Sequence, residues 1–110
     1  WNYGRYEGLT TAEIRRDQPK WHIFVHGCPE GESVADVAAR ADRVIARLRA
    51  ADDDVLLFSS GHFLRMFAAR WLGLPAAAGA AFHLDTTSLS ILAYERQKHE
   101  PVVRLWNSCC

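Results

Sequence analysis

The residues with the clearest chemical potential form one short polar stretch, Ser59-Ser60-Gly61-His62. The apolar residues 55–58 (VLLF) precede it and predict a short buried strand of a parallel sheet. Residues 63–72 follow with apolar side chains at helical spacing, which predicts a helix. A turn that leads from a strand into a helix exposes free backbone N–H groups at the positive end of the helix dipole. The stretch therefore predicts a binding site for an anion such as phosphate.

Two side chains in this stretch could take part in chemistry. Ser60 could donate one hydrogen bond to the anion, but it carries no positive charge. A catalytic serine is the alternative, yet a nucleophile elbow requires glycine two residues before and two residues after the serine, where this chain has Phe58 and His62. His62 begins the expected helix and could bind phosphate or act as a base. It could also simply line or cap the site.

A third candidate is the carboxyl of Glu7, which lies between Tyr6 and Gly8 and is therefore expected on a loop. A carboxyl beside phosphate oxygens is favoured in its protonated form by the like charge, which suits a general acid. An ordinary surface glutamate is the alternative. Further along, Glu32 and Ser33 precede a long helical pattern, so we expect them first to cap that helix and only secondly to form a cleft wall.

These segments together resemble the histidine phosphatases, the phosphoglycerate mutase-like superfamily. FSSGHFLR with the following WLGLP resembles the family's second catalytic segment, YGRYEGLT resembles its general-acid segment, and GCPEGES resembles its GES turn. Their order and spacing also match, so the resemblance covers the chain from Trp1 to about Asn107.

The resemblance implies phosphomonoester hydrolysis through a phospho-histidine intermediate, without a metal or other cofactor. Glu7 would protonate the leaving oxygen and later activate water, and Ser60 with Gly61 would form the turn that faces the phosphate. Arg65 matches an arginine of the same segment, where an internal ion pair or carbonyl clamp is favoured ahead of direct phosphate contact. The ligand would be a small phosphate ester or inorganic phosphate.

Two departures from the family pattern weaken the implied activity. The chain contains no Arg-His-Gly, which holds the family's nucleophile in its N-terminal half, and Ser60 occupies the position of the second catalytic histidine. Phosphate-monoester hydrolysis can require rate enhancements of ~10²¹, whereas a positioned general acid supplies roughly 10² to 10⁴. We therefore expect a truncated, His-substituted phosphatase with little activity alone. The alternative is a non-catalytic remnant that binds phosphate or a partner.

Length and composition fit one cytoplasmic domain. At 110 residues the chain forms one domain at most, which we expect to be a single partial domain (residues 1–107) followed by a tail (residues 108–110). The formal net charge is zero, so nothing in the bulk charge attracts nucleic acid or an anionic membrane. No apolar run approaches the length of a membrane span. The three cysteines form no disulfide framework, which favours a reducing cytoplasm.

The remaining patterns predict an α/β fold, in which a central parallel strand and flanking helices are followed by a C-terminal β-hairpin. Helices are expected at residues 11–16 and 34–50, a helical turn at residues 20–25 with Trp21 and Phe24 facing inward, and hairpin strands at residues 88–94 and 101–106.

Two features of this predicted fold concern ligands and partners. The cluster His22, His26 and Cys28 has metal-ligand residue types, but no fourth ligand is evident, so chance proximity is favoured over zinc. A sheet built from half of the family's fold would leave an unpaired edge and exposed apolar surface. We therefore expect the chain to pair with another copy, through exchange of elements, or to require a companion N-terminal segment.

Overall fold

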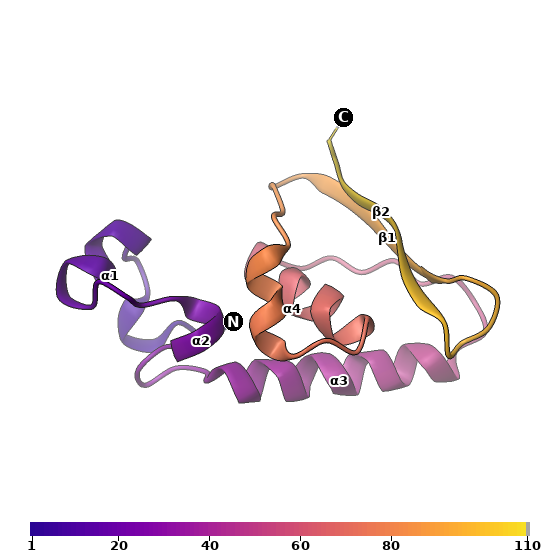
Figure 1. Ribbon diagram of the computed structural model, residues 1–110, viewed down its shortest axis with the longest axis horizontal. Coiled ribbons are helices and arrows are strands. Elements are labelled where there is room, and N and C mark those ends of the chain that lie inside the picture. Colours follow the sequence, from indigo (N-terminus) through magenta and orange to yellow (C-terminus); the bar gives the residue numbers. More distant parts are fainter. Residues whose placement is uncertain (110) are drawn as a thin grey trace.

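The computed structural model describes residues 1–109, in which one long helix runs along one side, with the other helices and a two-stranded hairpin beside it (Figure 1). The elements, in chain order, are the 3₁₀ helix η1 (Gly4–Tyr6), the helices α1 (Thr11–Asp17), α2 (Ile23–His26), α3 (Val34–Ala50) and α4 (Gly61–Trp71), the 3₁₀ helix η2 (Ala76–Ala81), and the strands β1 (Ser88–Tyr94) and β2 (Pro101–Cys109). The fold is α/β, as the sequence predicts.

Helix α3 is the longest element, and its predicted bounds are confirmed. It begins with a capping box, since the Ser33 side chain accepts from the Asp36 backbone and the Asp36 carboxylate accepts from the Ser33 backbone. One stripe of the helix is fully or almost fully buried, at Val37, Ala41 and Ile45. This stripe forms one side of the hydrophobic core.

Helix α4 lies across α3 and supplies the other half of the core. Phe63, Met66, Phe67 and Trp71 are buried at helical spacing. Arg70 of α4 binds both carboxylate oxygens of Asp42 of α3, at 2.8 and 3.0 Å. A bidentate pair of this kind fixes the relative position of the two helices.

The predicted C-terminal hairpin is confirmed as an antiparallel pair. Strand β2 continues to Cys109, so Ser108 and Cys109, which we expected in an unstructured tail, belong to the strand, and Cys110 lies outside the described residues. At the other end of the hairpin the Lys98 ammonium donates to the backbone carbonyls of Arg49 and Ala51. A cation at the carboxyl end of α3 is favoured by the helix dipole and by its free carbonyl groups.

The prediction of a central parallel strand at residues 55–58 is wrong for this chain. The sheet of the described residues contains only β1 and β2, and residues 55–58 have no regular secondary structure. Their side chains are exposed, from 40% at Leu57 to 89% at Phe58. Within residues 1–109, no backbone–backbone hydrogen bond joins this segment to another. A β-strand exists only through hydrogen bonds to a neighbouring strand, and the described residues provide none.

The shorter helical predictions are confirmed with small shifts. The turn expected at residues 20–25 forms as α2, and Trp21 and Phe24 are buried as predicted. The helix after the polar stretch begins two residues earlier than predicted, at Gly61. No helix among the described residues combines the length and the apolar character of a membrane span.

The N-terminal residues dock onto the loop before α3 through very close backbone contacts. Arg5 N donates to Pro29 O at 2.9 Å, and Glu32 N donates to Asn2 O at 2.8 Å. A Cβ added to Gly31 would lie 2.4 Å from Asn2 O and 2.6 Å from Gly4 N, both backbone atoms. Only glycine at position 31 permits this approach.

We therefore expect Gly31→Ala to lower the free energy of unfolding by about 1–3 kcal/mol, the usual cost of overpacking. Urea denaturation followed by circular dichroism measures the change. Gly61→Ala is the matched control, because the nearest atom to its added Cβ is 4.0 Å away. Equal stability of the two variants would show that the close contact is not required.

Candidate functional site

The polar stretch forms the start of α4, next to a cavity of about 240 Å³. Ser60 is the N-cap residue with extended backbone angles, and its hydroxyl makes no capping hydrogen bond. Gly61 is the first helical residue and, together with Ser59 and Ser60, lines the cavity. The backbone N–H groups of the first turn of a helix have no intrahelical partner. This end of α4 therefore offers unpaired N–H donors and a free hydroxyl.

The wall of this cavity also carries a carboxylate that sequence reasoning missed. Asp85 lines the cavity, with Asn107 Nδ2 2.9 Å from one carboxylate oxygen and His83 Nε2 2.9 Å from the other. The hydrogen bond from Asn107, followed by that from His83, lowers the pKa of Asp85, so this carboxyl is ionised at neutral pH. A phosphate in the cavity would gain from the helix dipole but would be repelled by Asp85.

His62 points away from that cavity into a cluster of aromatic rings. Its Nδ1 lies 2.8 Å from the Tyr3 hydroxyl, and the rings of Trp1 and Phe24 pack edge-on at centroid distances of 6.3 and 5.9 Å. Burial, with smaller contributions from nearby positive groups, lowers the pKa of His62. The imidazole is therefore neutral at neutral pH. When Nδ1 accepts a hydrogen bond from the Tyr3 hydroxyl, the single proton of the neutral ring lies on Nε2.

Glu7 is the exposed residue that ends η1. Burial raises the pKa of both Tyr3 and Cys28, and the Glu7 carboxylate contributes to both shifts. Glu7 is thus near Tyr3, whose hydroxyl contacts His62. Within residues 1–109, no hydrogen bond or ion pair joins Glu7 directly to Ser60 or Gly61. The structure brings Tyr3 and His62 into contact, Ser60 and Gly61 line the cavity, and Glu7 is exposed at the end of η1.

Arg65 acts as the carbonyl clamp that the sequence favoured. Its Nε donates to Gly79 O at 3.2 Å and its Nη2 donates to Ala80 O at 3.1 Å. The guanidinium also lies 4.9 Å above the ring of Phe24. Arg65 therefore fixes η2 against α4, and two of its nitrogens are already occupied.

Glu32 and Ser33 both have structural roles. Ser33 caps α3, as predicted. Glu32 accepts hydrogen bonds from Arg40 at 2.8 and 3.2 Å and from the Asn2 backbone at 2.6 Å. Burial would raise the pKa of Glu32, but the Asn2 N–H and the Arg40 guanidinium together hold it below its usual value. Glu32 thereby anchors the N-terminal segment on α3.

The histidines of the candidate zinc cluster are used in local hydrogen bonds. His22 Nδ1 accepts from Phe24 N at 3.3 Å, and His26 Nδ1 accepts from His22 N at 2.9 Å. Among residues 1–109, no three His, Cys, Asp or Glu side chains are grouped so that they could hold a metal ion.

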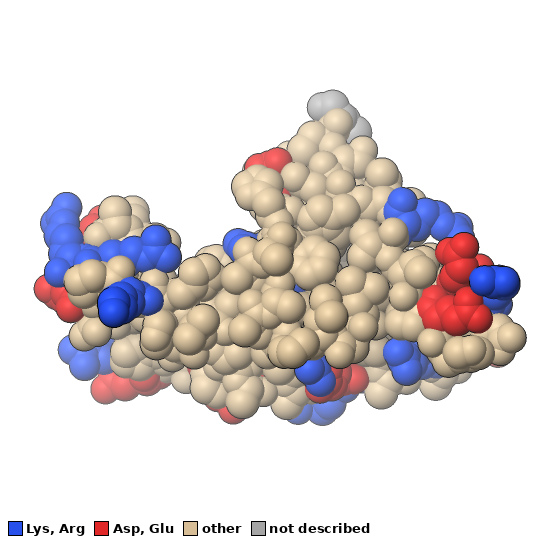
Figure 2. Space-filling view, viewed as in Figure 1, with Lys and Arg blue, Asp and Glu red and all other residues tan. Residues whose placement is uncertain are grey.

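The surface in Figure 2 carries its Lys, Arg, Asp and Glu side chains at the two ends of the molecule and along the lower edge, where α3 lies (Figure 1), with both signs mixed, and the middle above that edge is largely free of them. This face therefore has no continuous basic surface of the kind that nucleic-acid binding requires.

The sequence of residues 1–108 matches the family model of the histidine phosphatase superfamily, branch 1. The chain belongs to this superfamily. An acid phosphatase of Mycobacterium tuberculosis is 47% identical over 97 residues, which cover 86% of this chain and 48% of that protein.

Solved structures agree with this assignment. The structure of an open reading frame product of Mycobacterium tuberculosis matches with a TM-score of 0.94 at 41% identity, covering 99% of this chain and 56% of that one. A mycobacterial glucosyl-3-phosphoglycerate phosphatase, solved with inorganic phosphate, matches with a TM-score of 0.73 at 26% identity, covering 97% of this chain and 60% of that one. The chain thus spans about half the length of these relatives.

The lowered pKa of His62 predicts the pH dependence of stability. Because burial lowers the pKa of His62, and also that of His22, the unfolded chain binds these protons more readily than the folded one. The free energy of unfolding should therefore decrease as the pH falls through about 6.5, the pKa of an unfolded histidine.

We expect the urea midpoint to be lower at pH 5.5 than at pH 7.5, and this difference to be smaller in His62→Asn. His99→Asn, at an exposed histidine, should retain the full difference. An unchanged pH dependence in His62→Asn would contradict the assignment of the effect to His62.

Proposed function

We propose that this chain contributes to a phosphomonoesterase of the histidine phosphatase superfamily and that alone it has little activity. The observation that carries the proposal is the 47% identity to an acid phosphatase, together with a family match over residues 1–108. The substrate would be a small phosphate ester, with inorganic phosphate as product. Free thiols at Cys28 and Cys109 agree with a reducing compartment, and a cytoplasmic location stays a prediction.

In this proposal the start of α4 orients the phosphoryl group. The Gly61 backbone N–H and the Ser60 hydroxyl donate to phosphate oxygens, and Glu7 serves as the general acid for the leaving oxygen. His62 is the proposed base; Tyr3 holds it in the aromatic cluster, and it does not line the cavity at Gly61. Arg65 contributes its positive charge without contacting the phosphate directly, because two of its nitrogens donate to backbone carbonyls of η2. Residues 1–110 include no Arg-His-Gly nucleophile, which supports weak turnover by this chain alone.

The alternative proposal is a remnant that binds phosphate or a partner without catalysis. It is supported by Ser60 in the position of the family's second catalytic histidine and by the Asp85 carboxylate on the cavity wall.

Turnover of 4-nitrophenyl phosphate by the purified chain distinguishes the two proposals. The phosphatase proposal predicts slow turnover that decreases about tenfold or more in Glu7→Gln and in His62→Ala, because each removes a proton donor or base. Glu95→Gln, at an exposed glutamate of the hairpin, is the control. Turnover unchanged by both substitutions would mean that the activity comes from another site or a contaminant. A phosphate-dependent shift of the Gly61 amide without turnover would favour the remnant.

We also propose that the 110-residue chain self-associates through residues 55–58. Phe58 and Leu56 are 89% and 68% exposed, and the backbone of this segment is unpaired within residues 1–109. Unpaired backbone and contiguous apolar side chains together favour strand addition from a second copy. In a longer chain that carried the remaining part of the relatives' fold, that part would cover the same surface instead.

Size-exclusion chromatography with light scattering tests this proposal. We expect a mass above that of the 12.4 kDa monomer for the wild-type chain and a shift toward the monomer in Phe58→Lys. Leu9→Lys, at an exposed leucine outside this segment, is the control. A stable wild-type monomer would contradict the proposal.

A further inference from the structure

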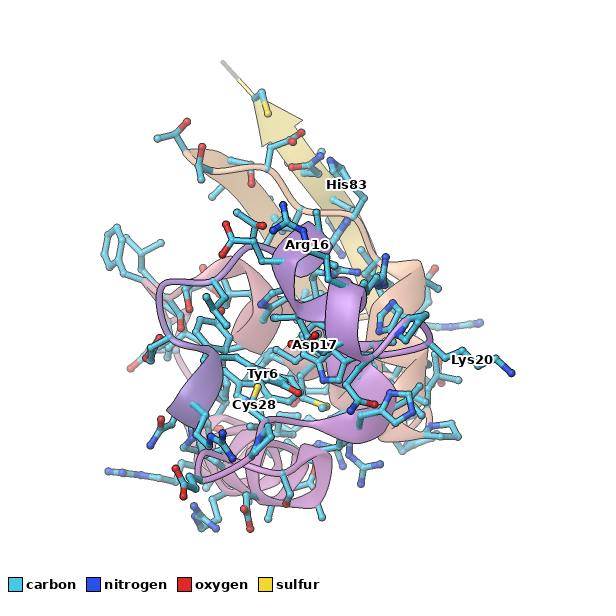
Figure 3. All side chains as sticks on the ribbon, turned by 90° about the vertical axis from the view of Figure 1, so that its left-hand side faces the viewer. Tyr6, Arg16, Asp17, Lys20, Cys28 and His83 are labelled. Atoms are coloured by element: carbon cyan, nitrogen blue, oxygen red, sulfur yellow. The ribbon has the colours of Figure 1, made fainter. Side chains whose placement is uncertain are left out.

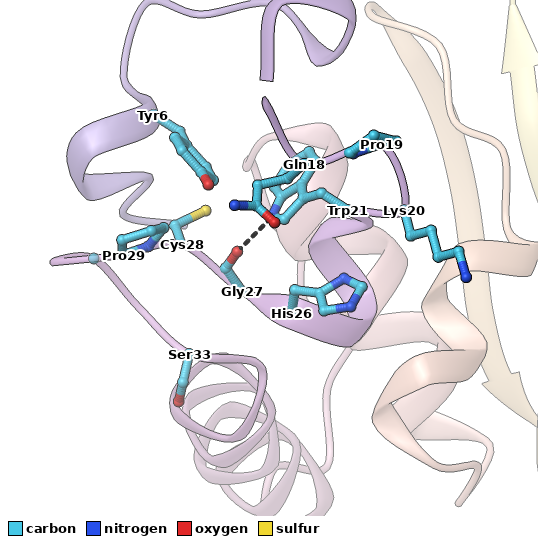
Figure 4. Close-up of a pocket in the computed structure, with 11 residues that line it drawn as sticks. Tyr6, Gln18, Pro19, Lys20, Trp21, His26, Gly27, Cys28, Pro29 and Ser33 are labelled. Carbon is cyan, nitrogen blue, oxygen red and sulfur yellow. Dashed lines mark hydrogen bonds between the residues drawn. The ribbon is translucent and has the colours of Figure 1, made fainter. Parts of the chain in front are cut away.

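A second and larger cavity, of about 610 Å³, lies between the end of α1 and the loop that precedes α3 (Figure 4). Sequence analysis did not predict it. The ring of Tyr6 and the ring of Trp21 meet edge to face at 5.3 Å in its wall. Trp21 is fixed there, because its Nε1 donates to Gly27 O at 2.9 Å. A volume of this size accommodates an organic group much larger than phosphate.

The apolar part of the wall is suited to a flat organic group. It consists of Pro19, Trp21, Pro29 and the side chain of Cys28, which is 7% exposed. Figures 3 and 4 both place Cys28 close to Tyr6, and in Figure 4 its sulfur points into the cavity. Aromatic and proline surfaces of this kind favour contact with an aromatic ring.

The polar part of the wall supplies hydrogen-bond donors and no carboxylate. Lys20 lies at the rim, and within residues 1–109 it forms no ion pair. His26 accepts at Nδ1 from the His22 backbone, which leaves Nε2–H as its ring donor. The Tyr6 hydroxyl and the Gln18 amide make no hydrogen bond among the described residues. No aspartate or glutamate of the described chain lines the cavity. Such a wall selects a group rich in acceptor atoms, most favourably an anion.

The cavity adjoins the residue proposed as general acid. Tyr6 directly precedes Glu7 in the chain, and the hydrogen bond from Arg5 N to Pro29 O joins the segment that carries Glu7 to the cavity wall. The Glu7 carboxylate also contributes to the raised pKa of Cys28 in that wall. A general acid protonates the oxygen of the leaving group, so the organic part of the ester must extend away from it.

We propose that this cavity, the leaving-group pocket, receives the organic part of the phosphate ester and selects an aromatic group that bears an anionic or other acceptor substituent. The proposal rests on the proposed phosphatase function, because that function places the phosphoryl group at Gly61 and the leaving oxygen at Glu7. It adds the substrate class, since a neutral alkyl ester would leave the donors of the wall unused, and a small polar ester would leave the aromatic surface uncovered.

Three probes separate the pocket from the phosphate site: 2-naphthalenesulfonate, inorganic phosphate and 2-naphthyl phosphate. In ¹⁵N-resolved spectra of the whole chain, we expect naphthalenesulfonate to shift the Trp21 indole N–H and inorganic phosphate to shift the Gly61 amide. Naphthyl phosphate should shift both. In a Cys109→Ser, Cys110→Ser background, naphthalenesulfonate should also slow alkylation of Cys28 by iodoacetamide.

Substitution in the pocket tests the recognition of the anion. Lys20→Gln should weaken naphthalenesulfonate binding about two- to fivefold, the range of an exposed ion pair, whereas Arg43→Gln on the surface of α3 should not. The proposal would be overturned if naphthalenesulfonate neither shifted Trp21 nor protected Cys28, or if Lys20→Gln bound it as well as the wild type. A Trp21 shift without any Gly61 response to phosphate would overturn the link to the ester. A missing Trp21 response beside a normal Gly61 response would overturn the pocket alone.

Discussion

The close approach of two backbone segments, residues 2–5 and residues 29–32, determines where the chemical groups of this chain lie. Glycine at positions 4 and 31 permits the contact, since a Cβ at either position would come within 2.4 Å of a backbone atom. Glu32 stabilises the same contact, because its carboxylate accepts hydrogen bonds from both the Asn2 backbone and Arg40. As a result Tyr3 reaches His62, and the segment that carries Glu7 is joined to Pro29. Both the His62 cluster and the wall of the leaving-group pocket depend on this one contact.

The helices could be predicted from the sequence, and the central strand could not, for the same physical reason. A helix satisfies its hydrogen bonds internally, so the apolar stripe and the Ser33 cap were sufficient to locate α3. The hairpin likewise carries its own partner strand. Residues 55–58 have the composition of a buried strand, but strand formation depends on a neighbour that the described residues do not contain. Their exposed apolar side chains form a surface of the kind that another polypeptide segment covers.

The candidate site was predictable in its residue types but not in its contacts. Local motifs suggest Glu7, Ser60, Gly61 and His62, whose site roles stay predictions, and for Arg65 the resemblance implies an internal ion pair or a carbonyl clamp, of which the structure shows the clamp. The contact between Tyr3 and His62 spans 59 residues in sequence, and local patterns carry no signal for such a distance. Asp85 was missed for the same reason, since Asn107, which donates a hydrogen bond to its carboxylate, lies far along the chain in β2. The wall of the larger cavity, which contains no carboxylate among the described residues, also combines residues from several segments.

The electrostatics of the α4 start explain why binding a phosphate dianion should need groups from outside residues 1–109. The helix dipole supplies about half an elementary charge. Asp85, whose lowered pKa keeps it ionised, places a full negative charge on the cavity wall. His62 is neutral because burial lowers its pKa, and Arg65 already donates two nitrogens to backbone carbonyls. At the proposed site these groups would orient a phosphoryl group through directed donors but would not neutralise it. Binding a phosphate dianion there would therefore need further cations.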